Sequence, residues 1–110
     1  MCSSDLAIED ELVGIVAEVR SAVALPLAVK LGPFYTNLTA LAARLAAAGA
    51  DGLTLFNRFY QPDLDIEALA IRSNLLLSTP HDLRLPLRWI ALLHGRLPLD
   101  LAAKIGRAHV

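Results

Sequence analysis

The sequence feature that most constrains the fold is a strand–helix–strand pattern over residues 26–57. A short apolar run at 27–31 contains Lys30 near its end, and a second run at 53–57 ends in Asn57. Two strands joined by a helix of this length are expected to be parallel neighbours with a right-handed crossover. Lys30 and Asn57 are therefore predicted to project from the same carboxyl-terminal edge of a parallel sheet, where α/β proteins place their chemistry.

The helix between these two strands has its own sequence signals. Thr36 or Asn37 is placed to cap its first turn, because a short side-chain oxygen accepts hydrogen bonds from the free amides there. Gly49 lies where a left-handed residue commonly ends a helix. The buried stripe predicted from helical spacing consists of Leu38, Leu41, Ala42 and Leu45.

The segment before this unit predicts another helix, which begins at residue 7 and fades at residues 21–23. Its acidic first turn, Glu9 to Glu11, suits the positive end of a helix dipole and is interpreted as solvated. The face predicted to be buried contains Ile8, Leu12, Ile15, Val16 and Val19.

The segment after residue 57 continues the α/β alternation. Residues 64–71 and the apolar run at 74–78 suggest a hairpin. Residues 79–82 lead into a helix, with Thr79 or Asp82 as its cap, that ends at Gly95, and residues 97–102 are the start of one more strand. Pro86 is compatible with the helix only if it lies in the first turn. The buried face predicted for this helix consists of Leu83, Leu87, Ile90, Ala91 and Leu93.

Composition and charge exclude several kinds of partner. The formal net charge of the 110 residues is −1, which gives no footprint for nucleic acid or an anionic membrane. No apolar run approaches the roughly 20 residues that a membrane-spanning helix needs, and a cytoplasmic origin is expected. Cys2 is the only cysteine, and the sequence contains no Gly-rich phosphate loop, GxSxG elbow or His/Cys metal spacing.

The two ends of the chain differ in character from the rest. Residues 1–6 and 104–110 resemble translated sequencing adapters, so residues 7–103 are expected to be the informative part. No functional role is expected for Cys2, Lys104 or His109.

Lys30 and Asn57 have the clearest functional interpretation. A buried ammonium is costly without a partner, so Lys30 either reaches solvent along its stem or lies beside an electron-rich ligand such as a reduced flavin. Asn57 both donates and accepts hydrogen bonds, which suits an amide-like ring edge, or it is a turn residue. Phe34, Tyr35 and the aromatic residues at 59–60 either wall a planar ligand or cover the sheet edge.

Several segments together show a family resemblance. PLAVKLGPFYTNL followed by AGADGLTLFNRFYQPDLD, with STPHDLRLPLRWIALL further on, resembles the dihydroorotate dehydrogenase family and its bacterial dihydroorotate dehydrogenase-like group. The resemblance covers nearly all of residues 7–103 and implies part of a (β/α)8 TIM barrel that binds FMN. It implies that Lys30 contacts the flavin and that Asn57 lies at the flavin–substrate site. Arg58 stands where the family often has Ser or Thr, which leaves the substrate contact open.

On this resemblance the chain is an internal fragment of a cytoplasmic FMN-dependent oxidoreductase of pyrimidine biosynthesis. It would oxidise dihydroorotate to orotate, or act on a related small pyrimidine, and neither nucleic acid nor membrane is expected as a partner. The catalytic base is expected upstream and the FMN phosphate site after residue 103, so the fragment alone is expected to be inactive. The electron acceptor and the oligomeric state of the intact parent are left open.

Two alternatives compete with this interpretation. One is a TIM-barrel lyase or aldolase in which Lys30 forms a Schiff base with a carbonyl substrate. The other is a non-catalytic α/β interaction module. A partial barrel would also leave one sheet face without its opposite wall, and we expect Val29, Leu31, Leu53 or Leu55 on that open side.

Overall fold

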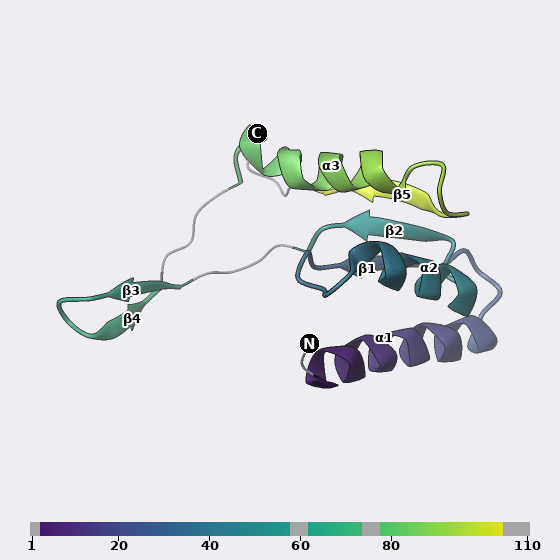
Figure 1. The fold of residues 1–110 in the computed structure, drawn as a ribbon, viewed down its shortest axis with the longest axis horizontal. Coiled ribbons are helices and arrows are strands. Elements are labelled where there is room, and N and C mark those ends of the chain that lie inside the picture. The colour runs from purple at the N-terminus through teal and green to yellow at the C-terminus, as the bar shows by residue number, and fades with distance from the viewer. Residues whose placement is uncertain (1–2, 58–61, 74–77, 105–110) are drawn as a thin grey trace.

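The computed structural model describes residues 3–57, 62–73 and 78–104 (Figure 1). Three helices, one 3₁₀ turn and five short strands alternate along this part of the chain, which confirms the predicted α/β class. In chain order they are α1 (Ser3–Ala22), β1 (Ala28–Leu31), α2 (Leu38–Ala48), β2 (Gly52–Leu55), β3 (Asp63–Asp65), β4 (Ala70–Arg72), η1 (Pro80–Leu83), α3 (Arg84–Leu93) and β5 (Asp100–Ala103).

The main sheet consists of three parallel strands in the order β1–β2–β5. Val29 of β1 pairs with Leu53 of β2, and Leu53 pairs in turn with Leu101 of β5. The predictions that β1 and β2 are parallel neighbours and that residues 97–102 begin another strand are confirmed. Strand β2 is central and forms backbone hydrogen bonds on both of its edges.

All three helices contribute to one core on one face of the sheet. Leu31, Leu53 and Leu55 are at most 1% exposed, and they share this core with side chains from α1, α2 and α3. Because side chains alternate along a strand, the opposite face presents smaller and more polar residues. We call it the open face; it consists of Ala28, Lys30, Gly52, Thr54, Asp100 and Ala102.

The prediction that Val29, Leu31, Leu53 or Leu55 lies on the open side is therefore wrong. These side chains are the large apolar ones of the sheet, and burying each against helices stabilises the fold by about 1.5–3 kcal/mol. The helices consequently cover this face and leave the one with alanine, glycine and threonine uncovered.

Helix α2 follows its sequence signals closely. The Oδ1 atom of Asn37 accepts a hydrogen bond from the backbone N–H of Ala40 at 3.0 Å, so Asn37 rather than Thr36 is the cap. Gly49 ends the helix with a left-handed φ of 115°. The buried residues of α2 are the predicted stripe of Leu38, Leu41, Ala42 and Leu45.

Helix α1 begins at Ser3 rather than at residue 7, and it packs through a face that overlaps only partly with the predicted one. Ile8 and Ile15 are 60% and 51% exposed, and Val19 is exposed as well. The residues that are buried or half-buried are Glu9, Leu12, Val13, Val16 and Arg20. Their spacing of three to four residues defines one helical stripe, and the helix lies against α2 (Figure 1). Leu12 and Val16 of the predicted face are packed as expected, but Ile8, Ile15 and Val19 are not. The packed stripe is shifted toward Glu9 and Arg20, which have polar partners.

The carboxyl end of α1 is tied to the sheet by Arg20. Its Nη1 atom donates to the Gly49 carbonyl oxygen at 3.2 Å and to Asp51 Oδ2 at 2.9 Å. Its Nη2 atom donates to two carbonyl oxygens of the α1–β1 connection. Asp51 Oδ2 also accepts from the Leu27 N–H at 2.8 Å, so this one guanidinium joins α1 to the start of both β1 and β2.

A hairpin lies in this segment, but both of its strands come from residues 63–72, so the predicted pairing of residues 64–71 with the run at 74–78 is wrong for β3 and β4. Strands β3 and β4 are antiparallel, with Leu64 opposite Ile71, and Arg72 pairs with Asp65 at 3.0 Å. Figure 1 shows the hairpin set apart from the main sheet. The apolar run that begins at residue 74 lies largely outside the described residues.

Helix α3 begins at Arg84, after the 3₁₀ turn η1 of residues 80–83, and Thr79, one of the two predicted caps, is the N-cap of that turn. Pro86 lies in the first turn of α3, as required. Leu93 is buried and Leu83 and Ile90 are half-buried, but Leu87 and Ala91 are exposed, which corrects two positions of the predicted face. The helix contacts β5 and β2 through a narrower stripe, and Leu87 and Ala91 lie outside it. No helix in the described ranges is long and apolar enough to cross a membrane.

Replacing Gly49 with alanine is expected to lower the free energy of unfolding by about 1–2 kcal/mol or more. A side chain is strained at this φ, and its Cβ would lie 2.3 Å from Arg20 Cγ. Gly14→Ala is the matched control, because Gly14 is exposed in α1 with no atom near its Cβ position. That control should gain about 1 kcal/mol. Urea unfolding followed by circular dichroism measures both; equal effects would contradict the prediction.

The stability of the chain is expected to fall in acid through Asp51. The N–H of Leu27 and the guanidinium of Arg20 hold the pKa of Asp51 below its usual value of 3.8, although burial opposes them. A carboxyl whose pKa is lowered by folding stabilises the fold above its unfolded pKa, and this contribution is lost as the pH falls through the folded pKa. Unfolding midpoints between about pH 2 and 6 should therefore depend less on pH in Asp51→Asn. An unchanged pH dependence in the variant would contradict this.

Candidate functional site

Lys30 and Asn57 lie at the same carboxyl-terminal edge of the sheet, as predicted. Lys30 is the third residue of β1, is exposed, and lies in register with Thr54 of β2 on the open face. Asn57 follows β2 by two residues and is also exposed. Its backbone N–H donates to the Leu31 carbonyl oxygen at 2.6 Å, so the backbone at Asn57 is joined to the residue after Lys30.

The ammonium group of Lys30 has a second lysine as its neighbour. A side-chain hydrogen bond to Lys104, the charge of Lys104 and, least of the three, desolvation lower the pKa of Lys30. The second lysine directly follows β5, and its backbone N–H donates to the Leu55 carbonyl oxygen at 2.6 Å. The two side chains therefore meet across the central strand, and a nearby positive charge disfavours the ammonium form of Lys30.

The loop after β1 adds two aromatic side chains to this edge. Phe34 is exposed, whereas Tyr35 is half-buried. A cavity of about 290 Å³ is lined by residues of this loop and of α1, namely Ile8, Glu9, Phe34, Tyr35 and Thr36. Arg58 and the aromatic residues at 59–60 lie outside the described residues. Of the four aromatic residues predicted to wall a planar ligand or cover the sheet edge, the structure therefore describes Phe34 and Tyr35.

Glu9 is a residue of this region that the sequence interpretation missed. It is only 6% exposed, and its Oε1 atom accepts a hydrogen bond from the Thr36 N–H at 3.2 Å. The prediction of a wholly solvated first turn is wrong for Glu9, although Asp10 and Glu11 are exposed. The available signal was its spacing from Leu12, Val16 and Arg20, which places it on the packed stripe.

The pKa of Tyr35 is raised by its position in this partly buried loop, beside Glu9. Burial raises the pKa of its hydroxyl, and the negative charge of Glu9 raises it further. Both effects disfavour the tyrosinate. Tyr35 is therefore held in the neutral form, in which its hydroxyl both donates and accepts hydrogen bonds.

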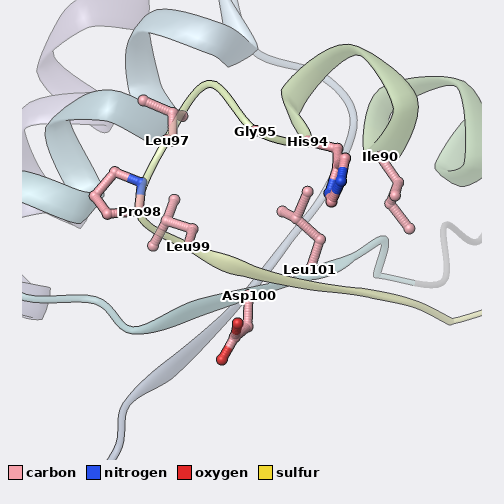
Figure 2. Close-up of a pocket in the computed structure, with 8 residues that line it drawn as sticks. All are labelled: Ile90, His94, Gly95, Leu97, Pro98, Leu99, Asp100 and Leu101. Atoms are coloured by element: carbon pink, nitrogen blue, oxygen red, sulfur yellow. The ribbon is translucent and has the colours of Figure 1, made fainter.

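A second hollow lies away from this edge. Figure 2 shows a pocket of about 550 Å³ between the end of α3 and the start of β5, lined by Ile90, His94, Gly95, Leu97, Pro98, Leu99, Asp100 and Leu101. Because the strands are parallel, the start of β5 is at the opposite end of the sheet from Lys30 and Asn57. Within the described part of the chain, no cluster of three or more His, Cys, Asp or Glu side chains is arranged to hold a metal ion.

Known proteins match this chain over part of its length. No protein-family model matches it. Dihydroorotate dehydrogenase A (fumarate) of Lacticaseibacillus paracasei is 48% identical over 48 residues, which are 44% of this chain and 16% of the relative. The catalytic subunit of dihydroorotate dehydrogenase B (NAD(+)) of Sulfolobus acidocaldarius is 47% identical over 53 residues, 48% of this chain and 18% of the relative.

The same subunit of a Geobacillus species is 40% identical over 57 residues, which are 52% of this chain and 17% of the relative. The matches thus span less than a fifth of the length of each of these relatives. Over about half of its own length, the chain is similar to dihydroorotate dehydrogenases, and the resemblance identified from its sequence motifs is confirmed.

Proposed function

We propose that residues 7–103 are part of an FMN-binding (β/α)8 barrel whose intact protein oxidises dihydroorotate, or a related small pyrimidine, in the cytoplasm. This proposal rests on the position of Lys30 and Asn57 at the same carboxyl-terminal edge of the sheet, in a chain similar to dihydroorotate dehydrogenases. The open face has the character of a barrel interior, because the helices cover only the other face of the sheet.

The residues of this edge fit a planar flavin. Thr54 and Ala102, which lie in register with Lys30 on the open face, have small side chains, and this leaves room above that face near Lys30. FMN, when bound, would supply the hydride acceptor. The Lys30 ammonium would stabilise negative charge on the ring edge, and the Asn57 amide would orient the ring of the pyrimidine by donating and accepting hydrogen bonds.

The names of the relatives differ in electron acceptor, which is fumarate in one and NAD(+) in the other two. Oxidation of dihydroorotate is the activity that the three names share, so it defines the proposal. An absorption spectrum of the intact protein containing this segment, recorded before and after anaerobic addition of dihydroorotate, tests it. A colourless protein, or a flavin that dihydroorotate does not bleach, would overturn it.

A Schiff-base enzyme is a second candidate, because Lys30 is exposed at the carboxyl-terminal edge of the sheet, where a carbonyl substrate can reach its amine. Borohydride trapping distinguishes the two functions, since only a Schiff base leaves a carbonyl substrate covalently attached to Lys30.

Lys30→Ala in the intact protein is expected to slow flavin reduction by about 10²–10³-fold, because a preorganised charge beside the ring is lost. Stopped-flow absorbance under anaerobic conditions measures the rate. Arg88→Ala is the control, since Arg88 is an exposed cation on α3 and is distant from the strand edge in sequence. Equal reduction rates for the Lys30 variant and the unmodified protein would exclude the flavin assignment.

Asn57→Ala is expected to weaken binding of orotate by about 1–3 kcal/mol, because polar groups of the pyrimidine lose their partner. Equilibrium titration of the flavin spectrum with orotate gives the dissociation constant. Asn57→Asp retains the shape and one acceptor but loses the amide donor, so it should also bind orotate weakly. A dissociation constant that does not change in either variant would remove Asn57 from the site.

A further inference from the structure

The carboxylate of Glu9 is buried without a cationic partner in the described part of the chain. The ion pairs there join Arg20 to Asp51, Arg44 to Asp10 and Arg72 to Asp65. The hydrogen-bond partner of Glu9 is instead a backbone amide, the N–H of Thr36. A buried charge is costly unless it is hydrogen-bonded. The Thr36 amide therefore stabilises the buried Glu9 carboxylate, and the carboxylate in turn holds the Thr36 amide in place.

This hydrogen bond attaches the loop between β1 and α2 near its end, one residue before the helix cap. Residues 32–37 leave β1 directly after Leu31 and end at Asn37, the cap of α2. Strand pairing fixes one end of this loop, and the helix cap fixes the other. Glu9 adds a third attachment at Thr36, next to Tyr35.

We propose that Glu9 is a positioning residue, which holds the loop of residues 32–37 against α1 and so fixes Tyr35 beside the strand edge that bears Lys30 and Asn57. The effect expected on catalysis rests on the proposed function. The effect on the loop does not, since it follows from the burial of Glu9 and its hydrogen bond to Thr36. Tyr35 would offer its neutral hydroxyl to a ligand at this edge, while its half-buried ring packs against the core.

Asp10 offers a matched control for Glu9. It is the next residue of the same helix and also a carboxylate, but it is exposed and pairs with Arg44 of α2. Removing its charge changes the net charge as Glu9→Gln does, without touching the loop. Any difference between the two variants therefore reports the contact with Thr36.

Hydrogen exchange of the Thr36 amide in the 110-residue chain tests the attachment directly. Glu9→Ala should accelerate exchange by about ten- to a hundredfold, as expected for loss of a hydrogen bond to a charged acceptor. Glu9→Gln keeps an acceptor oxygen and should retain most of the protection, and Asp10→Asn should retain all of it. Unchanged exchange in Glu9→Ala would overturn the proposal.

The titration of Tyr35 gives a second readout that loss of packing alone would not produce. Removing the charge of Glu9 in Glu9→Gln should lower the pKa of Tyr35, because one of its two causes is gone. Ultraviolet absorbance of tyrosinate, with Tyr35→Phe to assign the signal, measures this pKa. A Tyr35 that titrates identically in Glu9→Gln and in the unmodified chain would place its hydroxyl away from Glu9 and would contradict the proposal.

The consequence for function is measured in the intact protein. Glu9→Ala should raise KM for dihydroorotate about tenfold, with a smaller effect on kcat, and Glu9→Gln should restore most of the affinity. An accelerated Thr36 exchange combined with an unchanged KM would overturn the positioning role. If the unmodified protein does not oxidise dihydroorotate, the proposed function fails, and the exchange and titration results decide separately whether Glu9 holds the loop.

Discussion

The rest of the structure depends on the central strand β2, which is hydrogen-bonded to parallel neighbours on both edges. Leu53 and Leu55 point into the core, where each contributes about 1.5–3 kcal/mol by burial. Their burial determines which face of the sheet the helices cover. Alternation along the strand then places Thr54 on the open face beside Lys30, and the end of β2 leads into Asn57. The packing of this strand thus positions the candidate site.

Helix α1 is fixed to this sheet by polar contacts at both ends of an apolar stripe. Arg20 reaches the amino-terminal edge through Gly49 and Asp51, whereas Glu9 reaches the opposite edge through Thr36. The apolar residues between them supply burial but do not specify the rotation of a helix. Hydrogen bonds to charged groups have defined directions and are lost on rotation. The two charged residues therefore determine which stripe of α1 packs.

The two ends of the sheet differ in chemical character. The amino-terminal edge contains the Arg20–Asp51 contacts and the pocket below α3, and its polar groups are engaged in holding elements together. The carboxyl-terminal edge presents exposed Lys30 and Asn57, and a loop with two aromatic residues. Such a division between a stabilising edge and a reactive edge is typical of parallel α/β folds. It agrees with the similarity of the chain to dihydroorotate dehydrogenases.

The sequence by itself determined the β1–α2–β2 unit, because its signals are local: the Asn37 cap, the Gly49 terminus and a stripe at helical spacing lie within one short segment. It also placed Lys30 and Asn57 at one edge, since parallel pairing follows from the connecting helix. Only the tertiary structure decided the rotation of α1, the burial of Glu9 and the covered face of the sheet. These features depend on partners that are distant in sequence, such as Thr36 for Glu9 and Asp51 for Arg20. Helical spacing alone favours an apolar stripe of α1 over the neighbouring stripe that contains Glu9 and Arg20. The second stripe packs because the structure supplies hydrogen-bond partners for these two charged side chains.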